Sequence, residues 1–189
     1  MRRTIFACGL LLALAGIPSA VAGVPDGNQP QPAAQQSTSA RADGHSTDYW
    51  SRAVQRAQAQ TKHWLTIVRG RPPRIRQHTS SSAQTMRSLA RKWHRRAAAA
   101  RRTAQHPPER SAWNCIHHHE GAWTDPNAPY WGGLQMDYNF QSAYGAWLLK
   151  HKGTADHWAP LAQIWAGVRA WRVRGFEPWA GTAHACGVY

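Results

Sequence analysis

The segment CIHHHEGAW, residues 115–123, places one carboxylic acid directly behind three histidines. These residue types allow two kinds of chemistry: the histidines could hold a metal ion, or Glu120 could itself transfer a proton. Helical zinc sites place two ligands on one face, usually two histidines four residues apart around a glutamate. His117, His118 and His119 are consecutive, so on a helix they point about 100° apart. The other histidines are scattered without ligand-like spacing, and we therefore expect no metal and no cofactor.

Glu120 is the stronger candidate for chemistry, because glutamate is scarce and this one lies among aromatic residues. Trp113, Trp123, Tyr130 and Trp131 flank it in the sequence. Aromatic side chains exclude water from a carboxyl and favour its protonated form, which proton donation to a glycosidic oxygen requires. Tryptophan-rich clefts also stack well on the apolar faces of sugar rings. The alternative is a glutamate that makes a surface salt bridge at a helix end.

A second carboxylate would be needed for ordinary glycoside hydrolysis, about 5 Å away in a retaining enzyme and roughly 6.5–9.5 Å away in an inverting one. Asp125 and Asp137 are the candidates close in sequence. Asp125 belongs to an Asp-Pro-Asn turn signal, and Asp137 precedes a predicted helix, so each could instead cap the backbone. A lytic transglycosylase needs no second carboxylate, because the 6-hydroxyl of the substrate attacks and an anhydro-sugar results.

The region that carries these residues, 111–189, is rich in tryptophan and balanced in charge. Apolar periodicity predicts three helices, over about 111–120, 139–152 and 156–174. Between the first two, the Asp-Pro-Asn and Gly-Gly turn signals predict a short irregular β-like hairpin. We therefore predict a mostly helical α+β domain with its acid at the end of the first helix.

A basic arm, residues 47–110, precedes this region. Residues 41–110 hold 16 Lys or Arg against three acidic residues. Narrow, alanine-rich apolar stripes predict two helices, one from Asp48 to the Gly70 stop and one after the Ser80-Ser81-Ser82 cluster. These could pair as a hairpin, or remain partly ordered solvated helices. Such charge attracts anionic cell-wall polymers or a membrane surface; no base-reading motif is present, and we expect no specific nucleic acid.

The N-terminus predicts export. Residues 1–22 have the basic start, apolar run and small-residue cleavage site of a signal peptide, and residues 23–46 have the composition of a disordered linker. Removal of the signal would leave two cysteines, Cys115 and Cys186. An even pair in an exported protein predicts a disulfide, and two free thiols are the alternative.

The motifs of residues 111–189 resemble those of the resuscitation-promoting-factor family, a small lysozyme-like group similar to soluble lytic transglycosylases. The resemblance lies in Trp113-Asn114-Cys115, which opens the first motif and leads to Glu120, in the segment YWGGLQM at 130–136, and in the closing Trp179 to Gly187. Two features depart from the family pattern. Gly121-Ala122-Trp123 stands where Ser-Gly-Gly is usual, and the spacing from the first cysteine to the glutamate is longer.

The resemblance implies a domain that cleaves the β-1,4 bond between the amino sugars of peptidoglycan. Glu120 would act as the acid and then the base, Gln135 with the Gly132-Gly133 backbone would line the sugar site, and Cys115 would pair with Cys186. Tyr130, Trp131 and Trp123 are the aromatic residues expected at the substrate. We predict a secreted, cell-wall-associated monomer whose partners are glycan strands. The alternatives are a non-catalytic sugar-binding module and a cationic protein that binds anionic polymers.

Overall fold

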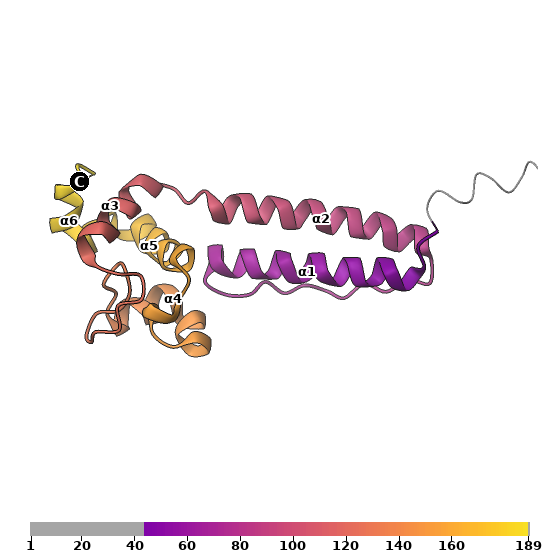
Figure 1. Cartoon of the computed structure of the whole chain (residues 1–189), viewed down its shortest axis with the longest axis horizontal. Helices are drawn as coiled ribbons and strands as arrows, with labels where there is room; N and C mark the ends of the chain where they lie inside the picture. The colour runs from indigo at the N-terminus through magenta and orange to yellow at the C-terminus, as the bar shows by residue number, and fades with distance from the viewer. Residues whose placement is uncertain (1–43, 189) are drawn as a thin grey trace, which may run out of the picture. The chain divides into compact units, whose positions relative to one another are not determined.

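The computed structural model describes residues 44–188, so the predicted signal peptide and almost all of the predicted linker lie outside the described residues. Within this range the chain forms six α-helices and two short 3-10 helices (Figure 1). In chain order these are α1 Thr47–Arg69, α2 Ala83–Gln105, α3 Arg110–Glu120, α4 Tyr138–Lys152, η1 Ala155–His157, α5 Pro160–Arg174, η2 Glu177–Trp179 and α6 Ala180–Ala185. None of the helices within residues 44–188 combines the length and the apolarity required to cross a membrane.

The predicted α+β class is wrong, because residues 44–188 contain helices and turns but no strand. The segment between α3 and α4 makes only one antiparallel bridge, in which Trp131 and Met136 exchange backbone hydrogen bonds of 3.1 and 3.0 Å. The pairing cannot extend in either direction. Tyr130 already donates its N–H to Asn127 in a turn, and Asp137 leaves the loop to cap α4. A single isolated bridge does not make a β-hairpin.

The ends of the arm helices follow the sequence signals. Ser46 caps α1 by accepting a hydrogen bond from the backbone N–H of Tyr49, and Ser82 caps α2 in the same way through Thr85. Gly70 ends α1 with a φ of 71°, a left-handed conformation that glycine adopts without a steric penalty. Both predicted helices of the arm are confirmed.

Their arrangement differs from the hairpin considered above, because α1 and α2 run parallel (Figure 1). The first residue of α1, Thr47, donates its hydroxyl to the carbonyl of Ser81, just before α2 begins. Residues 70–82 return along α1, where the Gln58 side chain donates to the Arg76 carbonyl. A helix of 23 residues is about 35 Å long, and thirteen extended residues can span about 43 Å. The proline-containing connection is therefore long enough to carry the chain back.

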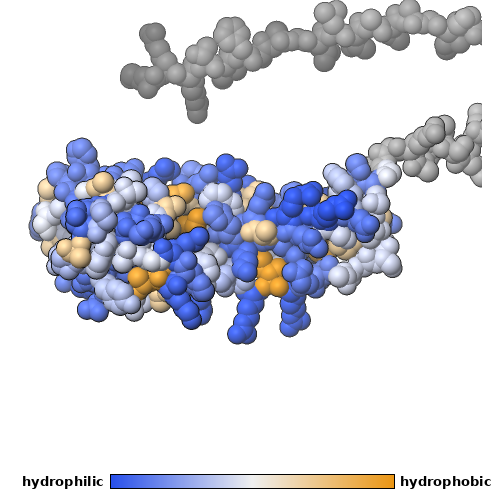
Figure 2. Space-filling model, turned by 60° about the horizontal axis from the view of Figure 1, so that its bottom comes forward, coloured by the Kyte–Doolittle hydropathy of each residue, from blue (hydrophilic) through white to orange (hydrophobic). Residues whose placement is uncertain are grey.

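The parallel pair packs through small residues. The hydrophobic cluster that the pair shares takes three buried residues from each helix: Ala53, Val54 and Ala57 of α1, and Met86, Ala90 and Trp93 of α2. Alanine at half of these positions lets the two backbones approach closely. The outer faces remain available for the basic side chains, and hydrophilic residues predominate on the face drawn in Figure 2.

Both arm helices end against α5. Arg169 of α5 donates from Nη1 to the carbonyls of Ile67 and Val68, each at 3.1 Å, and the indole of Trp165 donates to the Ala104 carbonyl at 2.9 Å. Ile67 and Ala104 belong to the same core as α3 and α5. The arm is thus continuous with the tryptophan-rich core rather than separate from it.

The three helices predicted within residues 111–188 are present, one of them displaced, whereas η2 and α6 were not predicted. The third was expected from residue 156, but α5 begins at Pro160, after the short helix η1. Proline fits the first turn of a helix and disfavours helical geometry in the residue before it, which accounts for the break. The predicted second helix is present as α4, with a kink at Gly145, where the ring of Trp158 packs.

Candidate active site

Glu120 is the last residue of α3, and its side chain is half-buried. Gly121 then ends the helix with a φ of 150°, outside the usual range of other residues. A Cβ at Gly121 would lie 3.3 Å from Nε2 of Gln135 and 3.4 Å from Oδ2 of Asp125. Gln135 and one candidate second carboxylate, Asp125, therefore lie beside Gly121, the residue that follows the predicted acid.

Thr182 of α6 holds the Glu120 carboxyl. Its hydroxyl donates to Glu120 Oε1 at 2.8 Å and lies 3.1 Å from the carbonyl of Trp179. A hydroxyl has one hydrogen and two lone pairs. It can donate to ionised Glu120, or donate to Trp179 while accepting a hydrogen bond from protonated Glu120. The contact is thus compatible with both states of a proton-transferring acid.

The side chain of Gln135 is fixed by its neighbours. Nε2 donates to Asp125 Oδ2 at 2.9 Å and to the Gly132 carbonyl at 3.0 Å. The other oxygen of Asp125 accepts from the backbone N–H of Asn127 at 3.1 Å, in the turn that the sequence indicated. Asp125 therefore caps the turn and positions Gln135 at once.

Asp137, the other candidate carboxylate, caps α4. Its Oδ1 accepts from the backbone N–H of Phe140 at 2.6 Å. This is the capping role considered from the sequence. Asp137 also faces an open groove, described next.

The groove has a volume of about 460 Å³ and lies between the loop, α4 and the segment after α5. Tyr130, with half of its surface exposed, forms part of the wall together with Gln135 and Trp179. The other lining residues mix aromatic and polar groups: Met136, Asp137, Asn139, Phe140, Ala143, Tyr144, Arg174 and Pro178. Glu120 is not part of this wall; it is linked to it through Thr182, whose hydroxyl also contacts the Trp179 carbonyl.

The remaining predicted substrate residues pack inside the loop between α3 and α4, residues 121–137. Gly132 and Gly133 are buried, and the N–H of Gly133 donates to Oε1 of Gln163 at 2.9 Å. The ring of Trp123 stacks on His117, with centroids 3.8 Å apart. Trp131 packs against the core. These four residues hold the loop that carries Tyr130 and Gln135.

Sequence reasoning missed Gln163 and Thr182. Gln163 is fully buried, and its Nε2, with two N–H donors, lies 2.7 Å from the Trp123 carbonyl, 2.8 Å from that of Ala155 and 3.1 Å from that of Trp158, so it ties α5 to the loop. A lone glutamine inside an apolar stripe was its only signal. Thr182 could have been found through the disulfide. Glu120 lies about one helical turn from Cys115 and Thr182 about one turn from Cys186, so a bond between the two cysteines brings Glu120 and Thr182 close together.

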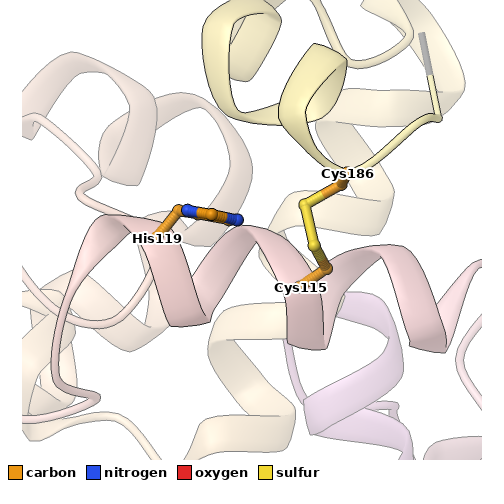
Figure 3. A group of neighbouring side chains, drawn as sticks. All are labelled: Cys115, His119 and Cys186. Carbon is orange, nitrogen blue, oxygen red and sulfur yellow. A yellow bond between two sulfur atoms is a disulfide. The ribbon is translucent and has the colours of Figure 1, made fainter.

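The predicted disulfide is confirmed: Cys115 and Cys186 are bonded, with Cα atoms 5.9 Å apart (Figure 3). It joins α3 to the end of α6. His119 lies beside it, and one of its ring nitrogens and the two sulfurs lie within 4.8 Å of one another. A metal binds cysteine as a thiolate, so this group has no cysteine ligand to offer while the disulfide is closed.

Comparison of the chain with protein-family models, with curated proteins and with solved structures found no match. The resemblance to the resuscitation-promoting-factor family, and the activity that it implies, stay predictions.

Proposed function

We propose that this protein is an exported peptidoglycan-cleaving glycosidase in which Glu120 is the general acid and base. The observation that carries the proposal is the position of the Glu120 carboxyl, half-buried at the end of α3 and held by the Thr182 hydroxyl. A fixed carboxyl with reduced access to water is what proton transfer to a glycosidic oxygen requires. The nearby groove supplies room for a sugar chain.

In the reaction, protonated Glu120 would give its hydrogen to the oxygen that bridges two amino sugars. The bond from that oxygen to the anomeric carbon breaks, and the leaving sugar departs as an alcohol. Glu120, now a carboxylate, accepts the hydrogen bond of Thr182. It then takes the proton of the hydroxyl that attacks the anomeric carbon, and this restores the acid.

The surroundings of the two aspartates favour attack by the 6-hydroxyl of the substrate. Both oxygens of Asp125 accept hydrogen bonds, from Asn127 and Gln135, and Asp137 caps α4. Carboxylates used in this way are poorly placed to act as a nucleophile or to activate water. An intramolecular attack needs neither, and the product would be an anhydro-sugar, as in lytic transglycosylases.

The groove has the composition of a sugar site. The exposed ring of Tyr130 offers a face on which a sugar can stack, and the side chains of Gln135 and Asn139 offer hydrogen bonds to hydroxyl groups. We place the glycan along this groove, with the bond to be cleaved near Trp179, whose carbonyl contacts the same Thr182 hydroxyl as Glu120.

The test compares the wild type with Glu120→Gln on purified peptidoglycan. The substitution keeps the shape of the side chain but removes its acid. We expect the wild type to release muropeptides and the variant to release none above background. Mass spectrometry of the fragments should find anhydro ends, whereas reducing ends would point to hydrolysis. Equal release by both proteins would overturn the assignment of Glu120.

One observation favours a second function, that of a non-catalytic sugar-binding module. Glu120 does not belong to the groove wall, so the groove could bind a glycan without cleaving it. In that case Glu120→Gln and the wild type would bind glycan strands equally and neither would release fragments.

A further inference from the structure

A second hollow, with a volume of about 790 Å³, lies between α1 and α2 toward their C-terminal ends. Because these helices run parallel, Ala59 of α1 and Ala97 and Ala98 of α2 lie along the same stretch. Alanine leaves space there, and longer side chains stand around it. We call this hollow the arm groove.

The longer side chains of the arm groove are basic, aromatic or polar. Arg101 places its guanidinium over the ring of Trp64, 5.9 Å from the centroid. An arginine stacked on an indole keeps its N–H groups free at the edge of the guanidinium, where they can bind an oxyanion in a fixed orientation. Arg102 follows on the same helix, and His63 and His94 also line the hollow. Among the described residues that line the arm groove, none is acidic.

Two other hollows of the arm do not share this composition. One, near the start of α2, contains Lys92 and His78 among small polar residues, and the other, beside the return segment, contains Lys62. Each holds one lysine and no arginine. A lysine is a point charge, whereas two neighbouring guanidiniums can each bind a phosphate through paired hydrogen bonds.

We propose that the arm groove binds the phosphate groups of a polyol-phosphate or sugar-phosphate chain. The groove has a volume of about 790 Å³, and its arginines are complementary in charge to phosphodiesters. Only the source of this polymer rests on the proposed function, since an enzyme that cleaves peptidoglycan would meet such chains in the same envelope. The binding itself depends on Arg101, Arg102 and Trp64 and not on Glu120.

The experiment uses the full chain and poly(glycerol phosphate) as the probe, with binding measured by calorimetry at two salt concentrations. The test variant is Arg101→Gln with Arg102→Gln. The control is Arg91→Gln with Arg95→Gln, which removes the same charge from exposed positions of α2 outside the arm groove. We expect the test variant to bind on the order of tenfold more weakly than wild type, and the control to bind within about threefold. Equal weakening by both pairs would mean that the charge of the arm acts diffusely and would overturn the proposal.

Two further measurements distinguish the possible partners and separate this proposal from the proposed function. Tighter binding to duplex DNA or to anionic lipid vesicles than to poly(glycerol phosphate), at equal salt, would also overturn the proposal. The Glu120→Gln variant should bind poly(glycerol phosphate) as the wild type does. This result would support the arm groove even if peptidoglycan cleavage were absent, so the two proposals can fail separately.

Discussion

The hydroxyl of Thr182 donates a 2.8 Å hydrogen bond to Oε1 of Glu120, across 62 residues of sequence. The disulfide between Cys115 and Cys186 brings these partners together, because it joins α3 to the end of α6. From the disulfide, the chain runs about one turn along each helix to reach Glu120 on one side and Thr182 on the other. The covalent link and the candidate acid are therefore parts of one local structure.

Replacement of Thr182 tests this contact. Thr182→Val keeps the shape of the side chain and removes the hydroxyl, so the Glu120 carboxylate loses its donor after it has given up its proton. A hydrogen bond to a charged group contributes about 1.5–3 kcal/mol, and we expect peptidoglycan cleavage to slow on the order of tenfold to a hundredfold. Initial rates of fragment release measure the effect.

Thr182→Ser is the matched control, because serine keeps the hydroxyl and loses only a methyl group. It should retain most of the activity, and the thermal midpoint of both variants should stay close to that of the wild type. A valine variant as active as wild type would show that Thr182 does not act on Glu120.

Removal of the disulfide should affect stability and activity together. The double variant Cys115→Ser with Cys186→Ser opens a loop with a sequence separation of 71. The chain-entropy relation gives a loss of about 4 kcal/mol of unfolding free energy. Denaturant titration measures this loss, and cleavage should fall because α6 is no longer tied to α3. Addition of a dithiol reductant should reproduce both effects in the wild type and leave the double variant unchanged; a wild type insensitive to the reductant would contradict the prediction.

Local signals predicted much of the fold. The serine cluster before α2, the Gly70 stop and the cysteine pair were each predicted from a few neighbouring residues or from the number of cysteines, and the structure contains all three features. The position of Asp137 ahead of a helix likewise predicted its cap. The caps and the glycine stop are fixed by backbone hydrogen bonding, which a short segment determines by itself.

Features that depend on distant partners could not be predicted. The parallel order of α1 and α2 follows from a return segment whose direction depends on packing along α1. The prediction of a β-like hairpin was wrong because the residues that flank the turns have other hydrogen-bond partners, although the turn signals themselves were present. Gln163 and Arg169 act through carbonyl groups of remote segments, and no pattern in the sequence marks a backbone carbonyl as available.

Gly133 tests the support of the loop. A Cβ at this position would lie 2.6 Å from Cε3 of Trp123 and would also meet the ring of His117. Gly133→Ala should therefore separate the stacked rings and lower the unfolding free energy by about 1–3 kcal/mol, the usual effect of overpacking. Urea titration measures the change.

Gly181→Ala is its control. Nothing lies within 4 Å of a Cβ at Gly181, which is inside α6. Alanine is favoured over glycine in a helix by about 0.5–1 kcal/mol, so this variant should be as stable as wild type or slightly more stable. Equal losses in the two variants would contradict the packing assigned to Gly133.

Arg169 tests the junction between the arm and the core. Besides the two carbonyls at the end of α1, its Nε donates to the Tyr144 carbonyl at the kink of α4. The parallel arm helices direct the negative ends of both dipoles toward α5, and a cation there is favourable. Arg169→Met removes the charge and leaves three carbonyls without this donor. We expect a loss on the order of 3 kcal/mol, about 1 kcal/mol for each carbonyl left without a donor, measured by urea titration at pH 8.

The pH dependence of stability, compared between wild type and Arg169→Met, gives an independent test of the same junction. Burial, with a smaller effect from the charge of Arg172, lowers the pKa of Arg169 below its usual range, to about 10. Between about pH 10 and the higher pKa of an ordinary arginine, the unfolded chain binds more protons than the folded chain, so this group makes folding more favourable as the pH rises. The stability of wild type relative to Arg169→Met should therefore be constant from pH 7 to 9 and then increase by about 1 kcal/mol per unit above pH 10. A relative stability that falls across that range would mean that the Arg169 cation is not desolvated at the junction.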